Sequence, residues 1–229
     1  MKTRVNIVLM FLTGSFFAGA QTDSSFLTTY YRQKLSLFNV LRADTGSVIF
    51  LGDSITDIAE WGELFKSSKV KNRGVSGDVS LGVLNRLTEV TRHLPAKVFI
   101  MIGINDIANN LPDSSIVNNI KAIIQRIQKE SPVTKIFVQS ILPTNNRFID
   151  FKRHQDKQAH IVAVNNKLQQ LAAQNQLVYI DLYSKMLDGE SKLDTRYTND
   201  GLHLTAAGYM VWMKELLNNH YLVAKDLQP

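Results

Sequence analysis

Short apolar stretches alternate along the chain with longer segments in which apolar residues recur every three or four positions. A short apolar run between turn residues is typical of a buried strand, whereas the wider spacing is typical of a helix with one buried face. The pattern predicts strands at residues 48–51, 70–75, 98–102, 136–138 and 177–182. It predicts helices at residues 22–42, 61–65, 81–90, 116–127, 155–174 and 205–218.

The order of these segments is strand then helix, five times over. Short apolar strands that alternate with helices form a parallel sheet covered on both faces. No repeat, low-complexity tract or run of charge marks a second domain, and 229 residues suit a single core. We therefore expect one α/β domain over residues 21–229, built on a five-stranded parallel sheet. In such sheets, functional side chains gather beyond the carboxyl ends of the strands.

The first 20 residues have the pattern of a signal peptide. Lys2 and Arg4 give a positive end, an apolar stretch follows at residues 7–17, and Ala18-Gly19-Ala20 is a small-residue cleavage pattern. The apolar stretch is shorter than the roughly 20 residues that a membrane-spanning helix needs. We expect cleavage after Ala20 and a periplasmic or secreted protein without stable membrane insertion; the alternative is an uncleaved N-terminal anchor.

The amino-acid composition excludes several kinds of binding and catalysis. The chain is 45% hydrophobic and 20% charged, with a formal net charge of +6, of which Lys2 and Arg4 supply two. Because the remaining basic residues are spread out, nucleic-acid binding is not expected. The chain has no cysteine, which excludes disulfides, thiolate metal sites, a cysteine nucleophile and a lipid-modified cysteine.

A candidate nucleophile stands where the first predicted strand ends, at Gly52-Asp53-Ser54. A serine hydroxyl is a weak nucleophile and needs an adjacent base. Of the five histidines, His203 lies in a glycine-containing turn after a strand, with Asp200 three residues before it. Asp200 can accept the Nδ1 proton and leave Nε2 of His203 facing Ser54. The sequence thus predicts Ser54, His203 and Asp200 as catalytic residues.

Acyl transfer also requires donors for an oxyanion. Candidates are the backbone N–H groups of Ser54 and Gly77 and the side-chain amide of Asn105, each at or after a strand end. Taken alone, each feature is an ordinary turn or helix cap. The hypothesis rests on their combination, because together they supply every role that the reaction needs.

Other chemistries match less well. The chain has no Gly-Lys-Ser/Thr phosphate loop, no His-Glu-x-x-His zinc pattern and no Gly-x-Ser-x-Gly elbow. Asp53 and Asp57 flank Ser54, but no distant residues complete a ligand set with them. We therefore expect neither a metal nor another cofactor.

At these residues the chain resembles the SGNH hydrolases, also called GDSL-type esterases and lipases, over about residues 47–220. Ile55 stands where the name-giving motif has leucine. Within the family, the chain is most similar to platelet-activating-factor acetylhydrolase catalytic subunits and bacterial sialate or carbohydrate O-acetylesterases. Four blocks occur in family order, at residues 52–54, 72–77, 103–106 and 200–203.

The resemblance implies a flavodoxin-like three-layer α/β/α sandwich. It also implies a nucleophile at Ser54, a base at His203, an orienting carboxylate at Asp200, and oxyanion donors at Ser54, Gly77 and Asn105.

These observations predict a secreted serine esterase that removes short acyl groups, acetyl above all, from carbohydrates. The predicted loops are short and no apolar lid is evident, which favours a small acyl group. Alternatives are a lysophospholipase or fatty-acyl esterase, a sugar O-acyltransferase, and an inactive carbohydrate-binding protein on the same fold. His154 borders a loop that can line the substrate cleft. Candidate substrate contacts, which can equally be ordinary loop residues, are Asp53, Asn145, Asn146, Arg147, Arg196 and Tyr197.

Overall fold

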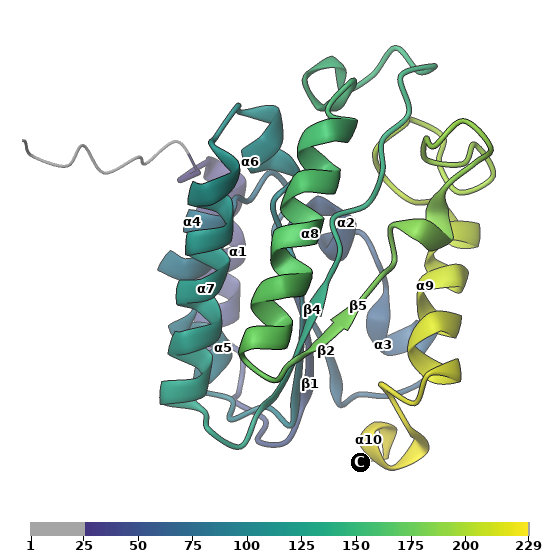
Figure 1. Ribbon diagram of the computed structural model, residues 1–229. Helices are drawn as coiled ribbons and strands as arrows, with labels where there is room; N and C mark the ends of the chain where they lie inside the picture. Colours follow the sequence, from purple (N-terminus) through teal and green to yellow (C-terminus); the bar gives the residue numbers. More distant parts are fainter. Residues whose placement is uncertain (1–25, 229) are drawn as a thin grey trace, which may run out of the picture.

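The computed structural model describes residues 26–228 (Figure 1). The predicted signal peptide at residues 1–20 lies outside the described residues, as does the start of the helix predicted at residues 22–42. No helix within residues 26–228 is both long enough and apolar enough to cross a membrane.

A five-stranded parallel sheet forms the centre of the protein, in the order β2-β1-β3-β4-β5. The prediction of five parallel strands is therefore confirmed. Every residue of β1 and β3 is buried, which explains why both read as continuous apolar runs. The strands are β1 (Val48–Gly52), β2 (Val70–Gly74), β3 (Lys97–Met101), β4 (Lys135–Gln139) and β5 (Val178–Ile180).

Helices cover both faces of this sheet, which confirms the predicted three-layer α/β/α arrangement (Figure 1). The helices α4, α7 and α8 lie on one face, and α3 and α9 lie on the other. The α-helices are α1 (Thr29–Val40), α2 (Ser54–Asp57), α3 (Trp61–Leu64), α4 (Ser80–Asn85), α5 (Thr88–Thr91), α6 (Ile104–Ala108), α7 (Asp113–Glu130), α8 (Gln158–Gln174), α9 (Ala206–Asn218) and α10 (Ala224–Leu227). Two 3₁₀ turns are η1 (Lys152–His154) and η2 (Ser184–Met186).

Aromatic packing joins the sheet to the face that α3 and α9 cover. Phe50 of β1 stacks on Trp61 of α3 with ring centroids 3.9 Å apart, and on Phe99 of β3 at 5.0 Å. Trp212 of α9 meets Trp61 edge to face at 4.8 Å, and its indole N–H donates to Gln139 at 2.8 Å. The sheet and one layer of helices therefore meet around the buried Phe50 ring, whose packing holds β1 in place directly before Ser54.

Several helices start at a different residue from the one predicted, because side chains form hydrogen bonds near the helix start. Within the described residues, α1 starts at Thr29, because the Thr28 hydroxyl accepts a hydrogen bond from the Tyr31 N–H and caps the helix. The helix expected at residues 155–174 starts at Gln158, since residues 152–154 form η1 and Gln155 donates back to the carbonyl of Phe148. The single helix expected at residues 81–90 is divided into α4 and α5.

A buried arginine ties the ends of β1 and β2 to the loop that follows β2. The Arg86 guanidinium donates to the carbonyl oxygens of Gly52 (3.1 Å) and Arg73 (3.0 Å) and to Asp78 Oδ2 (2.8 Å). It also pairs with Glu89 at 3.2 Å, and the side chains of Arg86 and Asp78 are fully buried. Because an unpaired buried charge is very costly, these partners must stay in place around it.

Replacing this arginine should destabilise the protein strongly. We expect Arg86→Met to lower the free energy of unfolding by about 3–5 kcal/mol, because the buried carboxylate of Asp78 loses its cation while Glu89 keeps only Arg73. Urea denaturation measures the change. The matched control is Arg147→Met, since Arg147 pairs with Glu190 where both side chains are more than half exposed. That variant should change stability by less than about 1 kcal/mol. Equal losses in the two variants would contradict the account.

Candidate active site

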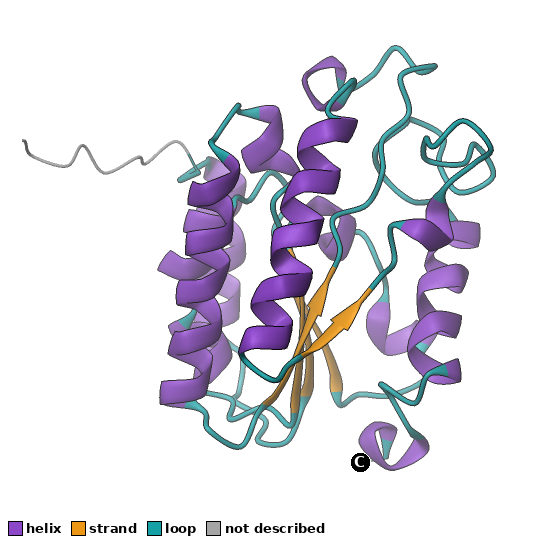
Figure 2. Ribbon diagram, in the orientation of Figure 1, coloured by secondary structure: helices purple, strands orange, loops and turns teal. Residues whose placement is uncertain are grey.

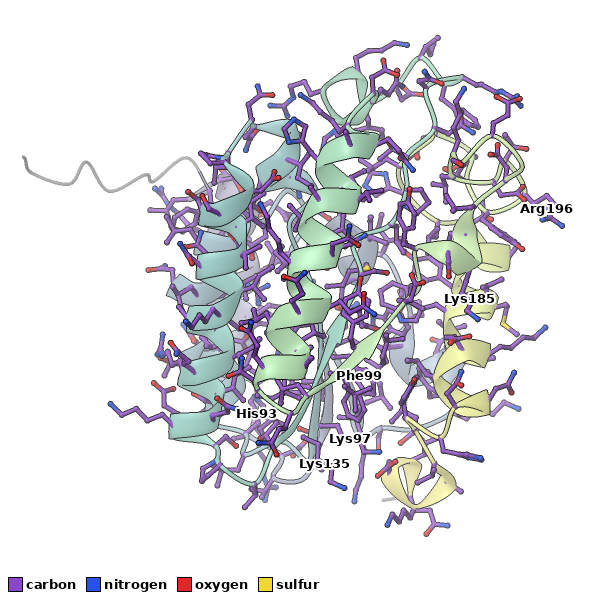
Figure 3. All side chains as sticks on the ribbon, viewed as in Figure 1. His93, Lys97, Phe99, Lys135, Lys185 and Arg196 are labelled. Carbon is purple, nitrogen blue, oxygen red and sulfur yellow. The ribbon has the colours of Figure 1, made fainter. Side chains whose placement is uncertain are left out.

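The parallel register brings the ends of three strands to one edge of the sheet. Gly52 lies opposite Gly74 on one side and Met101 on the other. All strands point toward the edge where the long loops gather (Figure 2). The segments that carry Ser54, Gly77 and Asn105 leave the sheet at this edge, as the sequence predicted. Lys97 and Lys135, the first residues of β3 and β4, lie at the opposite edge (Figure 3).

An unbroken chain of hydrogen bonds joins Asp200, His203 and Ser54. His203 Nδ1 lies 2.7 Å from Asp200 Oδ2, and Nε2 lies 2.9 Å from Ser54 Oγ. Since an ionised carboxylate only accepts, Nδ1 carries the proton and Nε2 presents its lone pair to the hydroxyl. The structure therefore brings the three predicted catalytic residues together in the order that general-base activation of a serine requires.

The Asp200 carboxylate is held in the ionised form. Its Oδ1 accepts the backbone N–H groups of Leu202 and His203, each at 2.8 Å. Burial alone would raise the pKa of Asp200, but the hydrogen bonds from the His203 ring and from these two N–H groups lower it below its usual value. An ionised Asp200 can stabilise the imidazolium that forms when His203 takes a proton.

Ser54 is the first residue of α2, and the structure has no space for a side chain at Gly52, two residues before it. A Cβ on Gly52 would lie 2.2 Å from the Met101 carbonyl oxygen and 2.3 Å from the Thr56 hydroxyl. Asp53 caps α2, because its carboxylate accepts the Ile55 N–H at 3.0 Å. Glycine is therefore required for the close approach of β1, β3 and α2 directly before the serine.

The structure gives Asp53, a predicted substrate contact, a place as the cap of α2, and its contact with substrate stays a prediction. Its carboxylate turns inward to cap α2, and the residue is only 1% exposed. Burial raises the pKa of Asp53 to about 7, with the carboxylates of Asp78 and Asp106 adding to the effect. The sequence shows only that Asp53 precedes Ser54, and it cannot show that the helix start needs a buried acceptor.

The loop that carries Gly77 is anchored from two sides. Gly77 has φ +80°, a conformation that glycine adopts readily, and no atom lies within 4 Å of the position of a Cβ. Next to it, the Ser76 hydroxyl and N–H donate to Asp57 Oδ2 of α2 at 2.8 and 3.1 Å. On the other side, Asn105 Nδ2 donates to the Asp78 carbonyl at 2.9 Å. The loop backbone is therefore held between α2 and α6 beside the serine.

The remaining predicted substrate contacts take different places. Asn145 is fully buried and bridges loops, because its N–H donates to the Gly201 carbonyl and its amide to the Leu193 carbonyl, at 2.8 and 2.7 Å. These hydrogen bonds support the loop of His203, and the contact of Asn145 with substrate stays a prediction. Asn146 is exposed and donates to Asp156 at 2.7 Å.

The two predicted arginines lie at the surface, each beside an acid. Arg147 pairs with Glu190, and Arg196 pairs with Asp194 at 2.6 Å. Arg196 also lies over the Tyr197 ring at 5.2 Å, and it projects outward from the loops (Figure 3). The structure places neither arginine in contact with Ser54 or His203. Each guanidinium forms a salt bridge with a neighbouring acid instead.

Phe151 and His154, in the segment before α8, lie against the candidate site, and neither contact was predicted from the sequence. The Phe151 ring meets the His203 ring edge to face, with centroids 4.7 Å apart. His154 Nε2 lies 2.9 Å from Asn105 Oδ1. The sequence suggested only that His154 borders the cleft, because an irregular loop has no periodicity from which its path can be predicted.

The fold and the grouping of these side chains are those of serine-dependent ester hydrolases. Residues 50–211 match the profile of the GDSL-like Lipase/Acylhydrolase family. Because this match covers well over half of the chain, the protein belongs to that family and is a hydrolase acting on esters. The predicted membership of the SGNH, or GDSL-type, hydrolases is confirmed.

Three similar proteins place the chain within the family. Human platelet-activating factor acetylhydrolase IB subunit alpha2 is 27% identical over 187 residues, which are 79% of this chain and 77% of that subunit. A structure from Streptococcus pneumonia, described as a platelet activating factor, has a TM-score of 0.77 and 31% identity, over 87% of this chain and 95% of that one. A GDSL-like lipase from Bacteroides thetaiotaomicron has a TM-score of 0.72 and 27% identity, over 83% and 96% of the two chains.

The raised pKa of Asp53 predicts a pH-dependent stability. Between its ordinary value near 4 and the folded value of about 7, the folded protein holds a proton that the unfolded chain has lost. The contribution of Asp53 to the stability of the wild type therefore falls as pH rises through this window. Asp53→Asn cannot titrate, so its free energy of unfolding relative to wild type should rise between pH 5 and pH 8 in urea denaturation.

The matched control for this prediction is Asp44→Asn. A hydrogen bond from Lys71 lowers the pKa of Asp44, so this carboxyl is ionised in both states above pH 5. Its difference from wild type should be constant between pH 5 and pH 8. A constant difference for Asp53→Asn as well would show that burial does not hold a proton on Asp53.

Proposed function

We propose that the protein hydrolyses short acyl esters through an acyl-enzyme at Ser54. The observation that carries the proposal is the continuous hydrogen-bond chain Asp200–His203–Ser54. His203 Nε2 removes the hydroxyl proton as Ser54 Oγ attacks the ester carbonyl, and the resulting imidazolium is stabilised by Asp200. The tetrahedral oxyanion accepts hydrogen bonds from the N–H groups of Ser54 and Gly77 and from the Asn105 amide.

Collapse of the tetrahedral intermediate completes the first half of the reaction. The bond from the carbonyl carbon to the alcohol oxygen breaks, and the imidazolium of His203 gives its proton to the departing alcohol. A water molecule then attacks the acyl-Ser54 carbonyl while His203 takes a proton from it. Collapse of the second intermediate releases the carboxylic acid and returns the proton to Ser54 Oγ, so the enzyme ends as it began.

We favour an acetyl group on a carbohydrate as the substrate. The acetyl group is supported by the similar human protein, which is named an acetylhydrolase. The carbohydrate is supported by polar loops, which line a cavity of about 140 Å³. The Thr144 hydroxyl lines this cavity and donates to the His154 carbonyl at 3.1 Å. The residues that line it are Thr144, Asn146, Asp156, Gln158, Glu190, Ser191 and Lys192.

A longer chain on the ester is the second candidate, with a lysophospholipid or fatty-acyl ester as substrate. It is favoured by the apolar side chains of Ile149 and Phe151, which are 84% and 42% exposed. Phe151 also touches the ring of His203, so this apolar surface begins at the candidate base. Transfer of the acyl group to a second sugar uses the same site, and product analysis with an acceptor present distinguishes it from hydrolysis.

We also propose that the protein is exported. The support is the charged, then apolar, then small-residue pattern of residues 1–20. N-terminal sequencing of the protein purified from culture medium or periplasm tests this. A mature terminus at Gln21 supports cleavage after Ala20, and a terminus at Met1 contradicts it.

Loss of the nucleophile should abolish hydrolysis. We expect Ser54→Ala and His203→Ala each to lower kcat on p-nitrophenyl acetate by at least about a thousandfold, because the two residues act as one unit. The matched controls are Ser36→Ala, since Ser36 bonds only within α1, and His160→Ala, since His160 is exposed. Both should keep wild-type rates. An unchanged catalysed rate in Ser54→Ala would indicate another nucleophile, and a wild-type rate no higher than the background would indicate an inactive binding protein.

Acyl length separates the two substrate candidates. We expect kcat/KM to be higher for the acetate than for the decanoate ester of p-nitrophenol, because the proposed substrate carries a short acyl group. The comparison is made with wild type and with Phe151→Ala, which removes the apolar surface beside His203. A faster decanoate reaction that drops in Phe151→Ala would favour the lipid substrate and contradict our choice.

A further inference from the structure

We propose that His154 is a positioning residue for the oxyanion site, because its imidazole N–H holds the Asn105 amide in the orientation that donates to the reacting ester. The inference rests on the proposed function and adds a second histidine with a role different from that of His203. It is carried by the hydrogen bonds around Asn105, which lie on two sides of one amide group.

The orientation of the Asn105 amide follows from its two partners. The Asp78 carbonyl can only accept, so the atom 2.9 Å from it must be the donor, Nδ2. Oδ1 therefore faces His154 Nε2 at 2.9 Å. Because an amide oxygen only accepts, His154 must donate from Nε2. Of the two Nδ2 protons, one goes to Asp78 and the other is available to an oxyanion.

His154 is itself rigidly placed. It ends η1, it is only 5% exposed, and its N–H donates to the Phe151 carbonyl at 2.8 Å. Its own carbonyl accepts the Thr144 hydroxyl at 3.1 Å. These hydrogen bonds hold the main chain of His154 in place, and the ring is held by its burial and by its hydrogen bond to Asn105, as a group that orients another requires.

The same surroundings keep His154 neutral and in one tautomer. Burial, with the nearby charge of Arg153, lowers the pKa of His154 to about 4. Its Nδ1 has no hydrogen-bond partner within residues 26–228, so a proton placed there would face no acceptor. At neutral pH the proton therefore stays on Nε2, against Asn105. His203 by contrast has partners for both nitrogens, as a residue that exchanges protons requires.

One short turn contacts both halves of the candidate machinery. Phe151 lies against the ring of the proposed base, His203, and three residues later His154 bonds the proposed oxyanion donor, Asn105. The turn therefore links the base and the oxyanion donor, although Asn105 and His203 lie far apart in the sequence. Without His154, the Asn105 amide would keep only its bond to Asp78 and would be free to rotate away.

Replacement of His154 by Gln and by Met tests the proposal with two side chains of similar length. Only Gln carries a donor that can reach the Asn105 oxygen. We expect His154→Met to lower kcat on p-nitrophenyl acetate by about tenfold or more, below the roughly 10²–10³ cost of losing an oxyanion donor altogether. KM should change by less than about threefold, because positioning acts on the transition state. His154→Gln should restore most of the lost kcat.

Asn105→Ala provides the second arm. If His154 acts through Asn105, then His154→Met should have almost no effect on kcat in an Asn105→Ala background. A role in stability alone would give equal losses in the Gln and Met variants, tracking their melting temperatures, with independent effects in the double variant. Either result would overturn the proposal, as would a His154→Met kcat within about twofold of wild type. Ser54→Ala is assayed alongside, since its activity tests the proposed function separately from the role of His154.

Discussion

The buried guanidinium of Arg86 is the interaction on which the geometry of the candidate site depends. It satisfies the carbonyls at the ends of β1 and β2 and pairs with Asp78 in the loop that carries Gly77. A parallel sheet aligns its strand ends but does not by itself hold the loops beyond them. Here a charge that cannot remain unpaired in the interior holds Ser54 and Gly77 at a fixed separation.

Asp78 extends this arrangement to the third strand. Its carboxylate meets Arg86, while its backbone carbonyl accepts the amide of Asn105, which follows β3. All three proposed oxyanion donors are thus connected through one residue before any substrate binds. Such preorganised donors stabilise the charge that develops in the transition state. They lower the activation barrier because they do not have to reorganise during the reaction. His154 then completes the arrangement from the opposite side of the amide.

Much of this could be predicted from the sequence, because it depends on patterns that are local. The strands were predicted because buried parallel strands are apolar throughout, and Ser54, Gly77, Asn105 and His203 stand out because each follows a strand or turn. The hydrogen bonds of Asp53 and Asn145 to backbone groups were not predicted, because a polar side chain that satisfies the backbone is indistinguishable, in sequence, from one that meets substrate. The contact between His154 and Asn105 joins residues 49 apart through an irregular loop, which no periodicity predicts.

The central claim, that His203 activates Ser54 as a nucleophile, is tested most directly by covalent labelling. The full chain is incubated with an organophosphate ester, which phosphorylates an activated serine, and is then digested and analysed by mass spectrometry. The account predicts a single adduct on the peptide containing Ser54 in the wild type, and none at that position in His203→Ala over the same time. Equal labelling of Ser54 in both proteins, or labelling of a different serine, would contradict it.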